Sequence, residues 1–170
     1  MSTPPPVETW DDGSADRRFR VVPAAYLYLR REGKVLLHLR AGTGYRDGHW
    51  AAAAAGHVEP GESVLDAAVR EAREELGVEV APGDLEPVTT LHRGEPGGPA
   101  LEQRVDFIFS ATRWTGTPRL QEADKAADLG WFSFVALPDP VVPHELAVLR
   151  AMHDAGRHGH RVPPIMTSGF

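Results

Sequence analysis

The chain has 170 residues, of which 42% are hydrophobic and 25% are charged, so it can bury the core of one ordinary domain. Its 18 basic and 24 acidic residues give a formal net charge of -6, which argues against a protein that coats nucleic acid by bulk charge. The absence of cysteine excludes disulfides, thiolate zinc sites and a cysteine nucleophile. No apolar run approaches the ~20 residues needed to span a bilayer, and Met1–Glu8 does not resemble a secretory signal, so we expect a cytoplasmic protein that does not bind membranes.

The predicted elements lie between two irregular ends. Residues 1–18 are rich in Pro, Ser, Asp and Gly and are predicted to be a disordered arm, whereas residues 155–170 are predicted to be a C-terminal tail. The domain between them, residues 19–154, begins with a β-hairpin around the turn Arg31–Gly33. The expected strands are Val21–Leu29, Lys34–Leu39, Trp50–Ala55, Leu85–His92, Arg104–Thr112 and Leu129–Phe134, and Pro143–Asp154 is expected to be the last helix. Because helices and strands do not alternate strictly, the pattern favours an α/β (α+β) fold with a mixed sheet between helices.

The middle helix, which begins after Ser63, is the best-specified element. Ser63 and Asp66 form a capping-box pair, and Gly77 can adopt the left-handed backbone conformation that ends a helix. At about 100° per residue, one stripe faces the core; its members are Leu65, Ala68, Val69, Ala72 and Leu76. Glu71, Glu74 and Glu75 occupy the adjoining arc at spacings of three and four residues, which makes their side chains neighbours.

This acidic arc destabilises an isolated helix. Each like-charge pair at this spacing costs roughly 0.2–0.5 kcal/mol, and Glu74 and Glu75 also lie in the last turn, where the helix dipole opposes anions. One interpretation is a solvated face relieved by Arg70 and Arg73. The other is a site for a hard divalent cation, because Mg²⁺ prefers carboxylate and water oxygens.

The loop before the helix favours the cation site. It contributes Gly56, Glu59 and Glu62, and the spacing from Gly56 to Val78 reads G-x5-E-x7-R-E-A-R-E-E-L-G-V. This run resembles the signature of the Nudix hydrolase family, with every fixed position present and Ala72 as a small occupant of one apolar position. The resemblance implies a Nudix-like α/β/α sandwich over most of Arg20–Met152.

The resemblance also implies a chemistry and roles for single residues. Nudix enzymes hydrolyse a nucleoside diphosphate linked to a further group with Mg²⁺ or Mn²⁺, which neutralises phosphate charge and lowers the pKa of bound water. By position, the metal ligands are Gly56 through its carbonyl, Glu59, Glu71, Glu74 and Glu75. Glu71 is also the candidate general base, with Glu122 as its rival. Arg70 and Glu62 match positions that pair to hold the loop against the helix.

One departure from the common family pattern lies upstream of Gly56. Ala51–Ala55 replace the Leu-Pro pair and the extra glycine that many members carry. Small side chains here either widen the floor of the pocket or pack against a larger neighbour.

Substrate choice has to come from residues outside the signature. Tyr45 and Trp50 are candidates for stacking on a base, and Tyr26 and Tyr28 share one strand face. Candidate phosphate contacts are Arg40, Arg46, Arg93 and Arg104. Glu122 lies in a segment that resembles one found in small nucleotide-cleaving members, and His144 and Glu145 begin the last helix within reach of the same pocket.

Three functions stay open at this stage. The first is a MutT-like enzyme that acts on nucleoside triphosphates or related derivatives, and the second is a pyrophosphatase for nucleoside-diphosphate sugars or dinucleotides. The third is a nucleotide sensor that binds without cleaving. The isomerase of isopentenyl diphosphate shares the fold but uses a cysteine, which this chain lacks. The expected partner is a small nucleotide, and family members are often homodimers.

Overall fold

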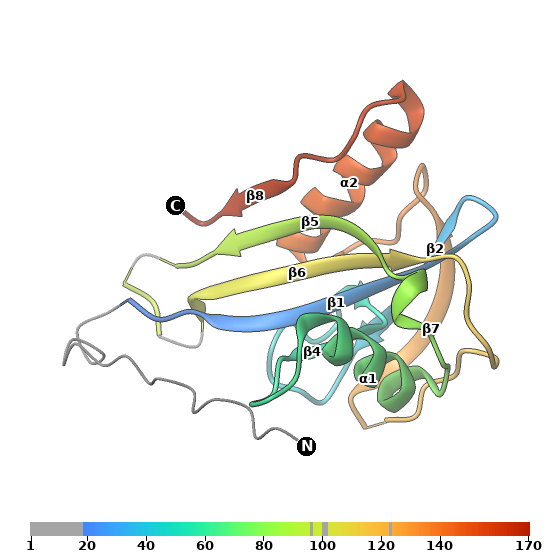
Figure 1. Ribbon diagram of the computed structural model, residues 1–170, viewed down its shortest axis with the longest axis horizontal. Coiled ribbons are helices and arrows are strands. Elements are labelled where there is room, and N and C mark those ends of the chain that lie inside the picture. Colours follow the sequence, from blue (N-terminus) through green and yellow to red (C-terminus); the bar gives the residue numbers. More distant parts are fainter. Residues whose placement is uncertain (1–18, 96, 100–101, 123) are drawn as a thin grey trace, which may run out of the picture.

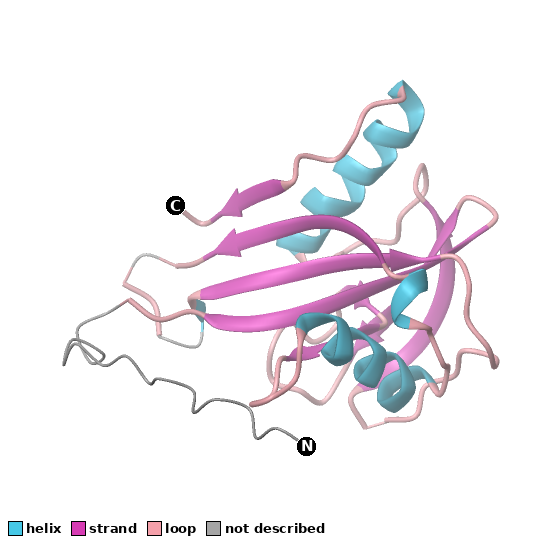
Figure 2. Cartoon of the chain, viewed as in Figure 1, coloured by secondary structure: helices cyan, strands magenta, loops and turns pink. Residues whose placement is uncertain are grey.

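A mixed β-sheet with one α-helix on each side organises the computed structural model, which describes residues 19–95, 97–99, 102–122 and 124–170 (Figures 1 and 2). The predicted arm, residues 1–18, lies outside the described residues. The strands within the described ranges are β1 (Val22–Arg31), β2 (Lys34–Arg40), β3 (Trp50–Ala52), β4 (Ala54–His57), β5 (Glu86–Arg93), β6 (Arg104–Ala111), β7 (Ala126–Ser133) and β8 (Ile165–Ser168). The helices are α1 (Val64–Leu76), a short 3₁₀ helix (Pro82–Asp84) and α2 (Pro143–His158).

The strand order along the sheet is β3-β2-β1-β6-β5-β8, while β4 also pairs with β1 and β7 with β2. The β1–β6 and β5–β8 pairs are parallel and the others are antiparallel, so the sheet is mixed as predicted. Two apolar clusters fill the layers. One contains α1 residues such as Leu76 and the other contains α2 residues such as Leu149, which confirms the α/β/α sandwich.

The predicted hairpin at the start of the domain is confirmed. β1 and β2 pair antiparallel through Arg31 and Lys34, and the turn residues Glu32 and Gly33 have φ values of 52° and 72°. A two-residue turn with positive φ at both positions matches the twist of the strands, and glycine adopts that conformation without steric cost.

The alanine run differs from its prediction as one strand. β3 pairs with β2, and β4 pairs with β1, so the chain changes partners at Ala53. Ala51–Ala54 are all at most 2% exposed. Alanine carries little strand propensity, so long-range pairing rather than local sequence decides where this segment breaks.

α1 has the termini that the sequence predicts. The Ser63 hydroxyl accepts a hydrogen bond from the Asp66 backbone N–H, the Asp66 carboxylate accepts one in return, and Gly77 ends the helix at φ 66°. The prediction that Leu65 faces the core is wrong, since it is 39% exposed while Glu71 is buried. The helix therefore turns its buried face further towards the acidic arc than the apolar stripe suggested.

The C-terminal residues are more ordered than the predicted tail. α2 continues four residues beyond Asp154 to His158, and Ile165–Ser168 form β8 beside β5 (Figure 1). β8 was not predicted, because its four residues show little alternation and the strand is defined by a partner about 75 residues away. No helix within the described ranges is long and apolar enough to cross a membrane.

Candidate active site

Arg70 is the centre of the loop–helix junction. Its guanidinium donates two hydrogen bonds to Glu62, at 3.0 and 2.9 Å, and one to the His57 carbonyl oxygen at 3.0 Å. It also donates to Glu71 at 2.6 Å and to Glu74 at 3.0 Å. The expected Arg70–Glu62 pair is thus present and is bidentate, a geometry that Lys cannot reproduce.

Gly56, the first residue of the signature, lies directly against Glu71. A Cβ atom at position 56 would overlap the Glu71 carboxylate, so only glycine leaves room for that group beside β4. Burial raises the pKa of Glu71, and the Arg70 guanidinium opposes this shift in part. Glu71 therefore holds a fixed position and an elevated proton affinity.

Glu75 lies one turn further along α1 and has little compensation for its charge. Its carboxylate accepts a hydrogen bond from the Ala55 backbone N–H at 2.8 Å. Burial is the main cause that raises the pKa of Glu75 to about 8, and the nearby Glu71 and Glu122 carboxylates add to the shift. Such a carboxylate gains most from a cation beside it.

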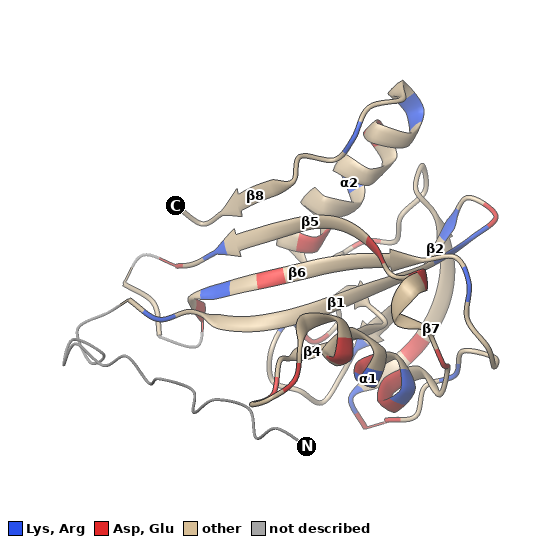
Figure 3. Cartoon of the chain, in the orientation of Figure 1, with Lys and Arg blue, Asp and Glu red and all other residues tan. Residues whose placement is uncertain are grey.

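The donor set fits a hard divalent cation. It consists of oxygens from Glu71, Glu74, Glu75 and the Gly56 carbonyl, which are the ligand types that Mg²⁺ prefers. Acidic residues gather on α1 and on the loop before it (Figure 3). Arg70 donates hydrogen bonds to both Glu71 and Glu74. In the described part of the chain, no three His, Asp or Glu side chains lie close enough together to form a complete metal site. Glu59 is exposed, with its N–H bonded to Glu62.

A cavity of about 340 Å³ opens beside this carboxylate cluster. Its wall includes Gly56 and Glu75 from the signature together with residues of β1, β2, β5, β6 and α2. We call it the Glu75 cavity and define it by sixteen residues: Tyr26, His38, Arg40, Tyr45, Ala51, Ala52, Ala55, Gly56, His57, Glu75, Arg93, Glu102, Arg104, Val142, His144 and Glu145. Both explanations for the alanine run have support, since Ala51, Ala52 and Ala55 line this space while Ala53 and Ala54 pack in the core against α1.

The four residues expected to bind substrate divide into two groups. Arg40 and Tyr45 line the Glu75 cavity, where the Arg40 guanidinium lies 5.5 Å from the Tyr45 ring centroid. Trp50 does not line it, because its indole packs edge-on against Phe132 at 4.6 Å between ring centroids. Glu122 pairs with Lys125 and lines a smaller neighbouring space that also touches His38 and Glu75.

Two buried residues, one on the cavity wall and one behind it, are absent from the predicted site residues. His38, which the sequence assigns only to a strand, is 7% exposed and lines the cavity from β2. Asp106 is fully buried on β6, where it pairs with Arg93 and lies 3.4 Å from the Arg104 Nε. A charged residue inside an otherwise apolar strand was the available signal for Asp106.

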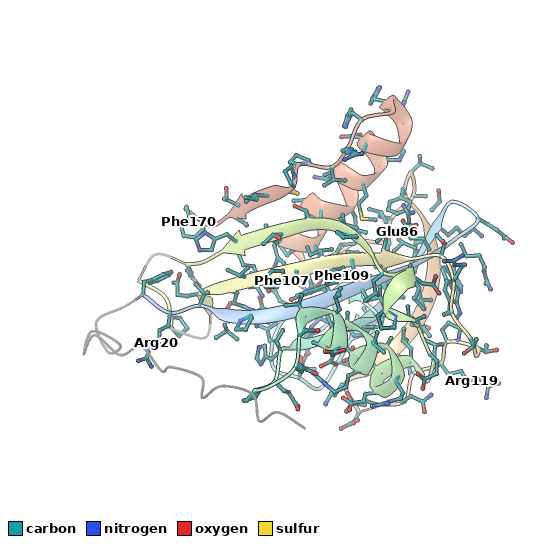
Figure 4. The ribbon with its side chains drawn as sticks, viewed as in Figure 1. Arg20, Glu86, Phe107, Phe109, Arg119 and Phe170 are labelled. Atoms are coloured by element: carbon teal, nitrogen blue, oxygen red, sulfur yellow. The ribbon has the colours of Figure 1, made fainter. Side chains whose placement is uncertain are left out.

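A larger cavity of about 790 Å³ lies elsewhere in the fold and contains none of the signature acids. Its lining includes Leu65 at the start of α1, Met152 on α2, and Phe107 and Phe109 on β6, which Figure 4 labels. Size alone therefore does not identify the reactive site, whereas the carboxylates beside Gly56 do.

Comparisons with known proteins agree with this geometry. A family model described as NUDIX domain matches residues 19–152. The CTP pyrophosphohydrolase of Escherichia coli (strain K12) is 40% identical over 133 residues, which cover 78% of this chain and 91% of that protein. The 8-oxo-dGDP phosphatase NUDT18 of Homo sapiens is 31% identical over 142 residues, covering 82% of this chain but only 41% of that protein.

Among solved structures, the MutT NUDIX hydrolase from Burkholderia pseudomallei superposes with a TM-score of 0.69 at 26% identity, covering 77% of this chain and 97% of that chain. The chain spans about a quarter of mouse NUDT18 and about two-fifths of human NUDT18. Since the family model covers most of the chain and includes every signature residue, the chain belongs to the NUDIX family.

Proposed function

We propose that the chain is a Mg²⁺-dependent pyrophosphohydrolase that cleaves a phosphoric anhydride bond in a nucleoside triphosphate or a related nucleotide derivative. The observation that carries the proposal is the position of Glu75 and Gly56 on the wall of the Glu75 cavity, which is large enough for a small ligand. The same wall contains Arg40, Arg93 and Arg104, which are cations suited to phosphate. The names of the E. coli and human relatives, a pyrophosphohydrolase and a nucleotide phosphatase, support the same class of reaction.

Glu71, Glu74, Glu75 and the Gly56 carbonyl are the residues that would hold Mg²⁺, and Mn²⁺ fits the same donors. The bound ion supplies charge neutralisation at the anhydride and a lower pKa for water. Glu59 was expected in this set, and its exposed side chain places it at the outer edge of the loop. Arg70 and Glu62 position the loop and the carboxylates rather than contact the reacting atoms.

Glu71 is the base that we assign, and Glu122 is the alternative. The Glu71 carboxylate is buried against Gly56, and burial raises its pKa, which favours proton transfer from water near neutral pH. The Glu122 side chain is 39% exposed and bonds Lys125. Its negative charge contributes to the raised pKa of Glu75, so it stays close enough to compete for the role.

One other function has specific support, and the sensor is disfavoured. Arg93 and Arg104 add positive charge at the cavity wall, which suits a second phosphate in a nucleoside-diphosphate sugar or dinucleotide. A sensor that binds without cleavage would need the same pocket without working carboxylates. This chain keeps all of the signature acids.

The test is a panel of nucleotides incubated with the purified chain and Mg²⁺, with products separated by ion exchange. Glu75→Gln and Glu74→Gln remove signature carboxylates, and Glu86→Gln on β5 is a matched control outside the cavity. Nucleoside monophosphate plus pyrophosphate, lost in both site variants, supports the MutT-like enzyme. A phosphorylated second product moves the assignment to the sugar or dinucleotide class. Tight binding without any cleavage favours the sensor and refutes the hydrolase.

The base is tested separately. Glu71→Gln should slow turnover by about 10²–10⁴-fold, in the range of a lost general base. A variant at full activity, combined with a slow Glu122→Gln, would assign the base to Glu122. The cytoplasmic location and the homodimer stay predictions from the sequence.

A further inference from the structure

Two arginines lie opposite each other on the wall of the Glu75 cavity. Arg93 on β5 and Arg104 on β6 are direct partners in the antiparallel register, and both line the cavity. Figure 3 shows basic positions at these neighbouring strand ends, with an acidic position further along β6. Like charges directly opposite each other destabilise a sheet, so strand pairing alone does not account for two arginines here. The pair requires negative charge, from the protein or from a ligand.

Asp106 supplies negative charge from inside the protein. It lies two residues beyond Arg104 on β6, so its side chain is on the same face of the sheet, and it is 0% exposed. Its Oδ2 atom accepts a hydrogen bond from the Arg93 Nε at 2.5 Å, and its Oδ1 atom lies 3.4 Å from the Arg104 Nε. Asp106 therefore holds each guanidinium group by the nitrogen nearest the backbone.

The outer nitrogens of the two guanidinium groups are left for a ligand. Asp106 is the only acidic partner of Arg104 among the described residues, while Arg93 also has Glu102, whose carboxylate lies 3.4 Å from Nη1. Of the side-chain nitrogens of the two arginines, only the Arg104 Nε is both buried and without a hydrogen bond. The Arg104 Nη atoms are therefore accessible to solvent. A planar guanidinium group offers such nitrogens as paired donors to a phosphate.

The signature loop lies on the same face of the sheet, two strands away. Across the sheet, Asp106 is beside Ala24 of β1, and Ala24 is beside His57 of β4, the residue after Gly56. Two strand spacings place His57 roughly 10 Å from Asp106. A phosphorylated ligand in the cavity can therefore contact the arginine pair and the signature loop together.

We propose that Asp106 is a positioning residue that holds Arg93 and Arg104 in place to bind one phosphate group of the substrate between them. The proposal rests on the proposed function, because it assumes a phosphorylated ligand in the cavity. Asp106 does not touch that ligand, since none of it is exposed. It fixes two long side chains before binding, which reduces the entropy that binding would otherwise cost. One buried negative charge also leaves two positive charges only partly neutralised.

Asp106 and Glu102 form a matched pair for the test, because each is an acid beside Arg93. Removal of either acid makes the cavity wall more positive, so charge alone would strengthen anion binding in both Asp106→Asn and Glu102→Gln. Positioning predicts opposite results. Asp106→Asn should weaken anion binding, whereas Glu102→Gln should leave it equal or make it tighter.

Inorganic tripolyphosphate is the probe, because it carries phosphate groups without a base or a sugar. Calorimetric titration in EDTA at low ionic strength measures its Kd for the parent chain and each variant. We expect Asp106→Asn to raise Kd at least about tenfold, the effect of losing a well-placed charge-assisted hydrogen bond. With the best-cleaved nucleotide and saturating Mg²⁺, KM should rise by a similar factor and kcat should change by less than about threefold. Glu86→Gln, outside the cavity lining, should change neither Kd nor KM.

A second variant covers the loss of a buried partner. Asp106→Asn leaves the Arg93 charge without its buried carboxylate, so circular dichroism checks that this variant is folded. Where it is not folded, Arg93→Lys decides the matter. Lysine keeps the charge and can pair with Asp106, but its single ammonium cannot hold Asp106 and a phosphate through separate nitrogens. Its Kd for tripolyphosphate should also rise at least about tenfold, and an unchanged Kd overturns the proposal.

The outcomes separate this inference from the proposed function. Equal or tighter tripolyphosphate binding by Asp106→Asn overturns the positioning role, and so does equal weakening by Asp106→Asn and Glu102→Gln. A parent chain that does not bind tripolyphosphate, or an Asp106→Asn variant with unchanged KM, also overturns it. A chain that binds tripolyphosphate as expected but cleaves no nucleotide refutes the hydrolase and leaves the arginine pair as a phosphate site.

Discussion

Two walls of the Glu75 cavity differ in charge and in how the fold builds them. The Gly56–Glu75 wall comes from one continuous loop and helix, where several carboxylates surround a single arginine. The opposite wall draws His38, His144 and Glu145 from β2 and α2, separated by about 100 residues, and bears two uncharged imidazoles. The first wall therefore concentrates negative charge, whereas the second combines one carboxylate with two uncharged rings.

This division implies that the chemistry and the stability of the two walls can be tested separately. Glu75 and Glu145 accept hydrogen bonds from the backbone N–H groups of Ala55 and Ala52, and Glu75 and His38 line one smaller space beside the cavity. We expect substitution of a carboxylate on α1 to affect mainly the proposed cleavage, and substitution of His38 to affect mainly the stability of the fold.

Glu75→Gln should produce the largest effect. The amide can still accept from the Ala55 N–H, but it cannot balance a cation, so we expect kcat to fall by about 10²–10⁴-fold. Rapid-quench assays with a cleaved nucleotide measure kcat, and circular dichroism checks that the variant is folded. An unchanged kcat would remove Glu75 from the proposed metal site.

Gly56→Ala should lower both activity and stability. The new Cβ overlaps the buried Glu71 carboxylate, which has to leave its hydrogen bond to Arg70, so the free energy of unfolding should fall by about 1–3 kcal/mol. Displacement of the carboxylate should reduce kcat by about 10²-fold, as misplaced catalytic groups do. Gly83→Ala is the matched control, because a Cβ there meets no atom within 4 Å. Full activity of Gly56→Ala would remove Glu71 from the reaction.

His38 should make the folded state sensitive to acid. Its folded pKa of about 4 lies below the 6.5 of an exposed imidazole, so its contribution to stability is complete above pH 6.5 and is lost as pH falls through 4. Across this window the difference is about 3 kcal/mol. His38→Asn should lose correspondingly less stability between pH 7 and pH 4.

Urea unfolding followed by circular dichroism at both pH values measures this difference. His153→Asn on the outer part of α2 is the control for general effects of removing a histidine. Equal acid losses in His38→Asn and the parent chain would show that His38 is not held neutral by burial, and would weaken its place on the uncharged wall.

The two walls also differ in how far the sequence predicts them. The Ser63 cap, the Gly77 end and the spacing of the signature are local, so α1 and its acids follow from neighbouring residues. The break at Ala53 and strand β8 depend on partners far along the chain, which residue propensities do not encode. No sequence motif marks His38 as a cavity residue, because its position on the cavity wall is defined only when β2 pairs with β3.

Substitution of Leu65 has the smallest expected effect. It tests whether the acidic residues or the apolar stripe decide which face of α1 is buried. The stripe placed Leu65 in the core, but the structure leaves it 39% exposed while Leu76 is fully buried. Leu65→Gln keeps helix propensity and should change the free energy of unfolding by less than about 1 kcal/mol, with kcat unaltered. Leu76→Ala should cost about 2–5 kcal/mol. Similar losses at both positions in thermal unfolding would mean that α1 turns its apolar stripe inward, which would swing Glu71 away from Gly56.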